Sequence, residues 1–211
     1  MPMSWELLSP PVTILIPHRG ESDYRQWRDW FLMGGLQMPP RTSYLETRGL
    51  SLTTQRTKLV QEALKGSAEY LFFLDDDVIG PPNLLTALLS YELPIACGLY
   101  WAKKRIEERG LAAWMKVHEN EYTSIDPNQD GQLIQVDVTG LGCALIHRSI
   151  FEKISEPFFE WLPDGVSEDF YFFEKVSREM GIKPMIDMKL KCDHIGLFRL
   201  TGDGTFTTLE K

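Results

Sequence analysis

The chain has 211 residues, 43% of them hydrophobic, which is enough for one sizeable core in one domain. Its formal net charge of −8 argues against a general nucleic-acid binder and against a protein that adheres to anionic membranes, because both are usually basic. Three widely separated cysteines without a CxxC pair favour a reducing compartment. No signal peptide is evident and no apolar run approaches the ~20 residues of a membrane helix, so we expect a cytoplasmic protein without a transmembrane segment.

The first half of the chain alternates short apolar runs with segments of helical spacing. In chain order we predict a strand at 12–16, a helix at 22–33, a weak strand at 43–46, a helix at 54–65, a strand at 70–74, a helix at 83–91 and a strand at 95–100. Strands that alternate with helices indicate βαβ units and a largely parallel sheet. The apolar runs are continuous, as expected of strands that are buried on both faces. We therefore predict an α/β fold.

The second half is more polar at first and then returns to the same pattern. Here we predict loops and a small hairpin at 103–131, strands at 135–137 and 144–146, a helical turn at 149–154, a helix from the cap Ser167 to 180, and a strand at 185–188. The tail, 197–211, fits a short hairpin or flap as well as it fits disorder.

Three consecutive acids, Asp75, Asp76 and Asp77, follow the strand predicted at 70–74. In open α/β sheets, ligands bind beyond the carboxyl ends of the strands. Adjacent carboxylates raise one another's pKa, and a divalent cation removes that cost. Because Asp75 and Asp77 lie on the same side of an extended chain, they are suited to a Mg²⁺ or Mn²⁺ site. The alternative is a solvated acidic turn that complements the following helix.

Four further side chains could carry chemistry, and each has a plainer alternative. Glu168 and Asp169 follow Ser167 in a first helical turn, where they either complement the helix dipole or present a general base. Arg56 lies near the start of a helix, where it either binds a pyrophosphate or is solvated. His194 is either a metal ligand or an ordinary histidine.

The segment Gly140-Leu141-Gly142 allows close backbone approach to a ligand, although a lone GxG is weak evidence. It lacks the third glycine of a dinucleotide-binding fingerprint. GxSxG, Walker-lysine and HExxH patterns are absent from the sequence.

The order of these motifs is more specific than any one of them. IPHRG, LTTQRTKLVQEAL, AEYLFFLDDDVIGPPNLL, VTGLGCALIHRSIFEKI, GVSEDFYFFEKVSREMG and CDHIG follow one another along the chain. This order resembles that of nucleotide-sugar glycosyltransferases with the GT-A fold, close to family 2, over roughly residues 11–196. The resemblance implies a Rossmann-like sheet flanked by helices in one domain, 1–211. It would have a nucleotide-binding half at about 11–100, an acceptor and catalytic half with a small lobe at about 101–196, and the tail at 197–211.

The resemblance also implies a metal site for Mn²⁺ or Mg²⁺. LDDDV looks like the family's DxD motif, with Asp77 as the main ligand. Asp75 would contact the ribose or the metal through water, and Asp76 would support either role. His194 matches a late histidine that completes such sites.

The remaining implied roles concern the donor, the acceptor and the base. The implied partners are a UDP- or GDP-sugar donor and a carbohydrate or other hydroxyl acceptor, with no nucleic acid. Asp169 matches the base of inverting enzymes, with Glu168 beside it. The implied donor-binding residues are Pro17, His18, Arg19, Glu46, Arg56, Asp75, Asp76, Gly140, Leu141 and Gly142. The chain departs from the family at PHRG and at Arg56-Thr57, which leaves the base of the nucleotide undefined.

Two other functions fit parts of the pattern. Nucleotidyl or other metal-dependent phosphoryl transfer also uses paired aspartates, and a degenerate module could bind a nucleotide sugar without turning it over. The acceptor lobe contains Trp101, Trp114, Phe158, Phe159 and Trp161, whose rings either stack on sugars or pack in the core.

Overall fold

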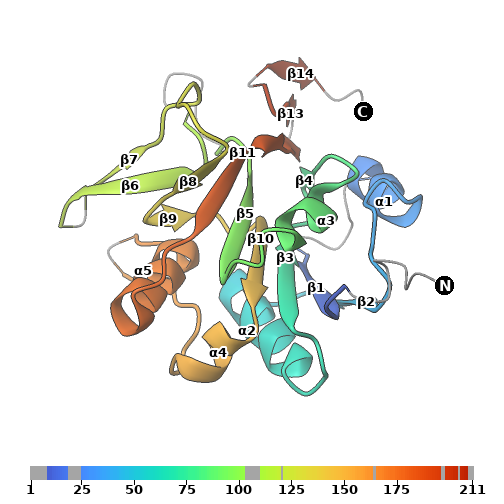
Figure 1. Cartoon of the computed structure of the whole chain (residues 1–211), viewed down its shortest axis with the longest axis horizontal. Helices are drawn as coiled ribbons and strands as arrows, with labels where there is room; N and C mark the ends of the chain where they lie inside the picture. Colours follow the sequence, from blue (N-terminus) through green and yellow to red (C-terminus); the bar gives the residue numbers. More distant parts are fainter. Residues whose placement is uncertain are drawn as a thin grey trace.

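The computed structural model describes residues 9–18, 25–102, 110–119, 121–163, 165–195, 198–203 and 205–208 (Figure 1). Its first half contains β1 (Val12–Pro17), α1 (Arg25–Leu32), β2 (Thr42–Thr47), α2 (Leu52–Ala63), β3 (Tyr70–Leu74), β4 (Val78–Ile79), α3 (Leu84–Leu89) and β5 (Ile95–Leu99). Its second half contains β6 (Ala113–His118), β7 (Glu121–Ser124), β8 (Leu133–Gln135), β9 (Val138–Thr139), β10 (Cys143–His147), α4 (Ser149–Lys153), α5 (Glu168–Met180), β11 (Met185–Lys191), β12 (Asp193–Ile195), β13 (Phe198–Leu200) and β14 (Phe206–Thr208). Arg19, and the start of the helix predicted at 22–33, lie outside the described residues.

A seven-stranded sheet forms the centre, in the order β2-β1-β3-β10-β5-β11-β8. β1 runs parallel to β2 and β3, and β11 runs parallel to β5. β10 is antiparallel to both of its neighbours, β3 and β5, so these two strands point the same way. The carboxyl ends of β1, β3, β5 and β11 therefore meet at one edge. The prediction of an α/β fold with a mostly parallel sheet is confirmed.

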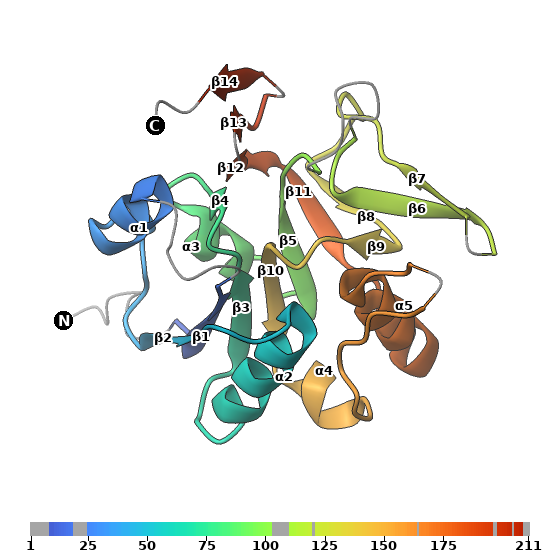
Figure 2. The same ribbon diagram turned by 180° about the vertical axis from the view of Figure 1, so that it is seen from behind.

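Helices cover both faces of this sheet (Figures 1 and 2). Along β3, Leu71 and Phe73 join one core cluster with residues of α2, α4 and α5, including Phe172. Phe72 and Leu74 join the other cluster, with residues of α1 and α3. The period of two in a strand thus sends the apolar side chains of β3 to two separate cores, which explains its continuous apolar sequence.

Two smaller sheets complete the fold. β6 and β7 form the hairpin predicted within 103–131, and β9 pairs with β6. In the tail, β13 and β14 form a hairpin that continues through β12 to β4, in the order β14-β13-β12-β4. The predicted hairpin of the tail is therefore present. Because β4 directly follows Asp77, this sheet fixes the far end of the acidic stretch.

The strand predicted at 135–137 is wrong in its bounds. β8 ends at Gln135 and pairs with β11, whereas β9 begins at Val138 and pairs with β6. The chain changes sheets at Asp137, whose carboxylate accepts hydrogen bonds from the Lys116 N–H at 2.8 Å and pairs with Lys183 Nζ at 2.6 Å. These polar contacts favour a bend over a continuous strand.

Candidate active site

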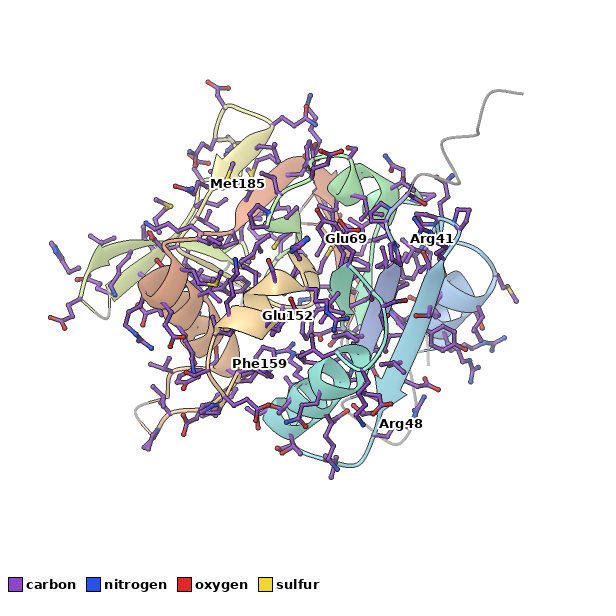
Figure 3. The ribbon with its side chains drawn as sticks, turned by 60° about the horizontal axis from the view of Figure 1, so that its bottom comes forward. Arg41, Arg48, Glu69, Glu152, Phe159 and Met185 are labelled. Atoms are coloured by element: carbon purple, nitrogen blue, oxygen red, sulfur yellow. The ribbon has the colours of Figure 1, made fainter. Side chains whose placement is uncertain are left out.

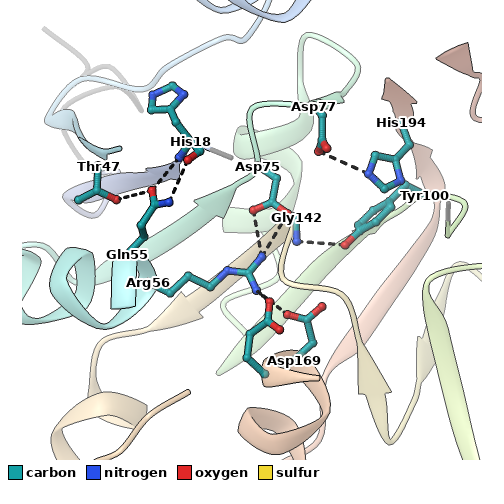
Figure 4. Close-up of polar contacts among 11 residues, drawn as sticks. His18, Thr47, Gln55, Arg56, Asp75, Asp77, Tyr100, Gly142, Asp169 and His194 are labelled. Carbon is teal, nitrogen blue, oxygen red and sulfur yellow. Dashed lines mark hydrogen bonds and ion pairs between the residues drawn. The ribbon is translucent and has the colours of Figure 1, made fainter. Parts of the chain in front are cut away.

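The three acids after β3 are all buried, with exposures of 5%, 2% and 1% for Asp75, Asp76 and Asp77. A buried carboxylate needs a partner of opposite charge or a hydrogen-bond donor. Each acid has a different partner: Asp75 pairs with Arg56 and Asp77 with His194 (Figure 4). Asp76 pairs with His18. The stretch is therefore not a solvated acidic turn.

Arg56, on α2, joins the acidic stretch to the start of α5 (Figure 4). Its Nη2 lies 3.0 and 3.1 Å from the two carboxylate oxygens of Asp75. Its Nη1 lies 2.5 Å from Glu168 Oε1 and 2.6 Å from Asp169 Oδ1. Burial by itself lowers the pKa of Arg56, but the carboxylates of Asp75, Asp169 and Glu168 raise it by more. The net pKa is above the usual value, so the guanidinium stays charged. This four-residue group is called the Arg56 junction below.

Asp169 is the more accessible acid at the start of α5. Its side chain is 22% exposed, whereas that of Glu168 is 3% exposed. Burial raises the pKa of Asp169 to about 7; Arg56 opposes this, and Glu168 and Asp75 add to it. The Leu141 N–H also donates a hydrogen bond to Asp169, which lowers its pKa. Asp169 is thus the candidate base that titrates near neutral pH.

His18 follows β1 and links Asp76 to the end of β2. Its Nδ1 lies 3.1 Å from Asp76 Oδ2, and its Nε2 lies 3.0 Å from Glu46 Oε2. Arg48, the residue after β2 that is labelled in Figure 3, has its Nη2 3.3 Å from the same Nε2. These contacts bring together three of the predicted donor residues, Asp76, His18 and Glu46. A fourth, Pro17, is the last residue of β1 and directly precedes His18.

Asp77 and His194 face one another across the turn between β3 and β4. His194 Nδ1 lies 2.8 Å from the Trp101 carbonyl oxygen, so this nitrogen carries the proton and donates it. The other ring nitrogen, Nε2, lies 3.4 Å from Asp77 Oδ1. A cation between these two atoms would contact one carboxylate oxygen and one imidazole nitrogen. A histidine that donates its second N–H to a carbonyl is also the usual form of a metal ligand.

The fit to a divalent cation is therefore good for two ligands. Among the described residues, no group of three or more His, Cys, Asp or Glu side chains is arranged to hold a metal ion. Mg²⁺ and Mn²⁺ are bound in many proteins by one or two protein groups, with substrate phosphates and waters as the other ligands. Asp77 and His194 suit such a site, whereas the carboxylate of Asp75 is held by Arg56.

The segment Gly140-Leu141-Gly142 lies against Tyr100, at the end of β5. The Gly142 N–H donates a hydrogen bond to the Tyr100 hydroxyl at 3.0 Å. A Cβ atom on Gly140 would lie 2.0 Å from that hydroxyl oxygen, so the close approach requires glycine. The Asp75 N–H donates to the Gly142 carbonyl at 3.1 Å, so the segment also borders the acidic stretch.

Sequence reasoning missed Tyr100 and Gln55. Burial raises the pKa of Tyr100 well above its usual range, and Asp169 and Asp75 add to this, so the hydroxyl stays protonated. Gln55 is buried beside Arg56 and hydrogen-bonds the backbone of His18. Its signal was a glutamine directly before the candidate arginine in an amphipathic helix.

The aromatic side chains of the predicted acceptor lobe divide into two groups. Phe158 and Phe159 pack against Phe151 in the core, as expected of ordinary apolar packing. Trp161 is 60% exposed and is available to a ligand. Trp114 packs against Phe170 of α5.

Comparisons with known proteins bear on the fold. No protein-family model matches the sequence, and a search of curated proteins finds no match. The crystal structure of A197 from STIV is 24% identical, with a TM-score of 0.67, and the match covers 95% of each chain. The structure of GalNAc-T7 with UDP, GalNAc and Mn²⁺ is 12% identical, with a TM-score of 0.56, over 89% of this chain and 44% of that one.

These similarities show that the fold is GT-A-like. At such identities they show the fold alone, and this chain spans less than half of GalNAc-T7. In the described part of the chain, no helix is both long and apolar enough to span a membrane.

Proposed function

We propose that this protein is a metal-dependent glycosyltransferase. It would move a sugar from a UDP- or GDP-linked donor to a hydroxyl group of a carbohydrate or another acceptor, with inversion at the anomeric carbon. The observation that carries the proposal is the Arg56 junction. Through it, the acids after β3 and the acidic pair of α5 meet at the carboxyl edge of a GT-A-like sheet, where ligands of such sheets bind. The neighbour GalNAc-T7, solved with UDP, GalNAc and Mn²⁺, supports the donor and metal classes.

Asp169 is the base in this proposal. Its carboxylate takes the proton of the acceptor hydroxyl, and that oxygen forms a bond to the anomeric carbon on the face opposite the leaving group. The bond from the anomeric carbon to the diphosphate oxygen breaks, and its electron pair leaves with the nucleoside diphosphate. Arg56 and the Leu141 N–H hold the Asp169 carboxylate in position. A Mn²⁺ or Mg²⁺ ion held by Asp77 and His194 would neutralise charge on the leaving group.

The donor side would be formed by the corner around His18. Pro17, His18 and Glu46, with Arg19 next in the sequence after His18, are the candidates for contacts to the nucleobase and ribose. Asp76 supports His18, and the backbone of 140–142 borders the sugar. The proposed nucleotide-binding half, about 11–100, thus supplies the contacts to the nucleobase and ribose. The half at about 101–196 supplies the segment beside the sugar and the catalytic base.

Donor turnover tests the proposal. Purified protein with Mn²⁺ and a panel of nucleotide sugars should release a nucleoside diphosphate, and Asp169→Asn should slow that release by about 10²–10⁴-fold with nucleotide binding retained. Glu179→Gln, on the same helix and away from the junction, is the matched control. Pyrophosphate release from a nucleoside triphosphate would instead indicate nucleotidyl transfer. Binding of a nucleotide sugar without turnover by any acceptor would indicate a binding module.

A further inference from the structure

Gln55 lies next to Arg56 on α2 and is 2% exposed. Its side-chain amide uses all four of its hydrogen-bonding positions. Oε1 accepts from the His18 N–H and from the Thr47 hydroxyl, each at 3.0 Å. Nε2 donates to the His18 carbonyl at 2.9 Å and to the Leu50 carbonyl at 2.8 Å. These partners fix which amide atom is oxygen and which is nitrogen, because each faces a group of opposite kind.

Gln55 hydrogen-bonds both the backbone N–H and the backbone carbonyl of His18, the residue directly after β1 (Figure 4). The His18 N–H also donates to the Thr47 carbonyl at 2.9 Å, so β1, the end of β2 and α2 converge on this backbone. The imidazole is then directed at Asp76 and Glu46, at 3.1 and 3.0 Å. A shift of this backbone would move the ring away from both acids.

The neighbouring side chains Gln55 and Arg56 thus diverge to two different parts of the site. Arg56 contacts the acids of the junction, and Gln55 contacts the corner that contains His18. The two side chains have no hydrogen-bond partner in common among the described contacts: Gln55 bonds His18, Thr47 and Leu50, and Arg56 bonds the three acids of the junction. Changes at the two positions should therefore have separable effects on donor binding and on the chemical step.

We propose that Gln55 is a positioning residue that fixes His18 for recognition of the donor nucleotide, without contacting the donor itself. This inference rests on the proposed function, because it takes the His18 corner as the nucleotide side of the site. It deepens that function by assigning nucleotide affinity to a buried amide that sequence patterns do not single out.

The experiment compares Gln55→Met and Gln55→Glu with Gln61→Met. Gln61 is an exposed glutamine on the same helix that donates a hydrogen bond to Glu156, and it serves as the control. Methionine keeps the length of the side chain but removes every hydrogen bond. Glutamate keeps the acceptor oxygen but places a second carboxylate oxygen against the His18 and Leu50 carbonyls. The dissociation constants of UDP and GDP are measured by calorimetry with Mn²⁺, together with KM and kcat for the donor.

In both Gln55 variants we expect the dissociation constant of the preferred nucleotide and the donor KM to rise about tenfold, the equivalent of roughly one hydrogen bond. We expect kcat at saturating donor to stay within about threefold, because the junction is intact. Hydrogen exchange of the peptide that contains 12–18 should be faster than in wild type. The Gln61 control should leave all these quantities unchanged.

Two results would overturn the inference: an unchanged KM in folded Gln55 variants, or a loss of kcat at constant KM. If Gln55→Met fails to fold, Thr47→Val removes only the hydroxyl that steadies Oε1 and should give a smaller rise in KM. If the wild-type protein binds neither nucleoside diphosphate, the proposed function itself fails. Binding by the wild type together with equal binding by the variants rejects the role of Gln55 alone.

Discussion

One guanidinium faces three carboxylates in the Arg56 junction, and this ratio governs the chemistry of the site. Arg56 is 1% exposed and is among the largest fully buried side chains of the described residues. The attraction between Arg56 and the three carboxylates opposes both the desolvation cost of this charged group and the repulsion among the acids. Because the acids outnumber the arginine, one of them is favoured in its protonated form. Asp169, the most exposed of the three, is the acid whose pKa is raised to about 7.

Replacement of Arg56 by methionine should destabilise the fold strongly. It leaves Asp75, Glu168 and Asp169 buried without their cation, and breaking a buried pair typically costs about 3–5 kcal/mol. Arg56→Lys keeps the charge but loses the two-pronged geometry, so we expect an intermediate loss. Urea unfolding at pH 8 measures both. Arg178→Met, at a side chain that is 68% exposed, is the control and should change stability by less than about 0.5 kcal/mol. A loss equally small for Arg56→Met would show that the junction contributes nothing to stability.

The raised pKa of Asp169 predicts opposite pH trends for stability and activity. The folded state favours the protonated acid, so this contribution to stability is fully present below about pH 4 and is lost as the pH rises through about 7. The base works only when ionised, so kcat/KM should rise through the same range. Activity profiles and urea unfolding between pH 5 and 8 test both trends. Asp169→Asn should lose its share of the stability trend. A flat kcat/KM profile across this range would contradict the assignment.

The acidic residues were the part of the site most open to prediction. Three acids after an apolar strand indicated a cation site, and the pair after Ser167 indicated either charges that complement the helix dipole or a base. Which acid faces which partner could not be decided from sequence patterns. Asp75, directly after β3, pairs with Arg56 of α2, a contact between residues 19 positions apart. The metal contact expected of Asp75 stays a prediction. The phosphate contact expected of Arg56 stays a prediction, since its guanidinium is held by carboxylates here.

At the scale of elements, the first turns of α2 and α5 organise the site. Ser51 caps α2, its hydroxyl accepting a hydrogen bond from the Thr54 N–H. Ser167 occupies the cap position of α5 but makes no side-chain capping bond. Glu168 and Asp169 lie in the first turn of α5 and also pair with Arg56. The same two acids therefore begin the helix and belong to the junction.

The segment Gly140-Leu141-Gly142 depends on glycine for a local steric reason. Gly140→Ala would place its Cβ 2.0 Å from the Tyr100 hydroxyl oxygen and 2.9 Å from Cζ. We expect a loss of about 1–3 kcal/mol, as for other overpacked buried sites. Adding Tyr100→Phe should recover part of that loss because it removes the nearer atom. At Gly66 a Cβ would meet only the Ala63 carbonyl oxygen, at 3.4 Å, so Gly66→Ala is the tolerated control. Equal thermal unfolding of the two alanine variants would contradict this account.

Strand positions were predicted well where apolar runs are continuous and poorly where polar contacts between distant segments decide. β1, β3 and β5 lie within a residue or two of their predicted bounds. The break at Asp137 depends on Lys116 and Lys183, which arrive from other elements. The reversal of β10 between β3 and β5 has no local signal either, because an apolar run reads the same in both directions.

At the scale of the whole molecule, the site gathers residues from across the chain at one edge of the sheet. Its parts follow strands or lie near the starts of helices. Asp77, the segment 140–142 and His194 come shortly after β3, β9 and β11, and Arg56 and Asp169 lie near the starts of α2 and α5. The net charge of −8 opposes the binding of a nucleoside diphosphate, so a cation should be required for tight binding. The order of motifs along the sequence predicted this convergence. The partners within it required the fold, because each contact joins segments that are distant in the chain.

That requirement gives a test of the assembled site. With Mn²⁺ present, a nucleoside diphosphate at about 100 times its dissociation constant should raise the melting temperature by roughly 5–10 °C, and without the metal it should raise it little. Asp77→Asn should abolish the Mn²⁺-dependent rise in melting temperature. It replaces the anionic ligand by a neutral amide, and the amide with the His194 imidazole should not hold the ion. His194→Ala should weaken it, and His118→Ala, at an exposed histidine of the β6–β7 hairpin, should leave it unchanged. A full Mn²⁺-dependent shift in Asp77→Asn would place the metal elsewhere and would separate the acidic stretch from the chemistry proposed for it.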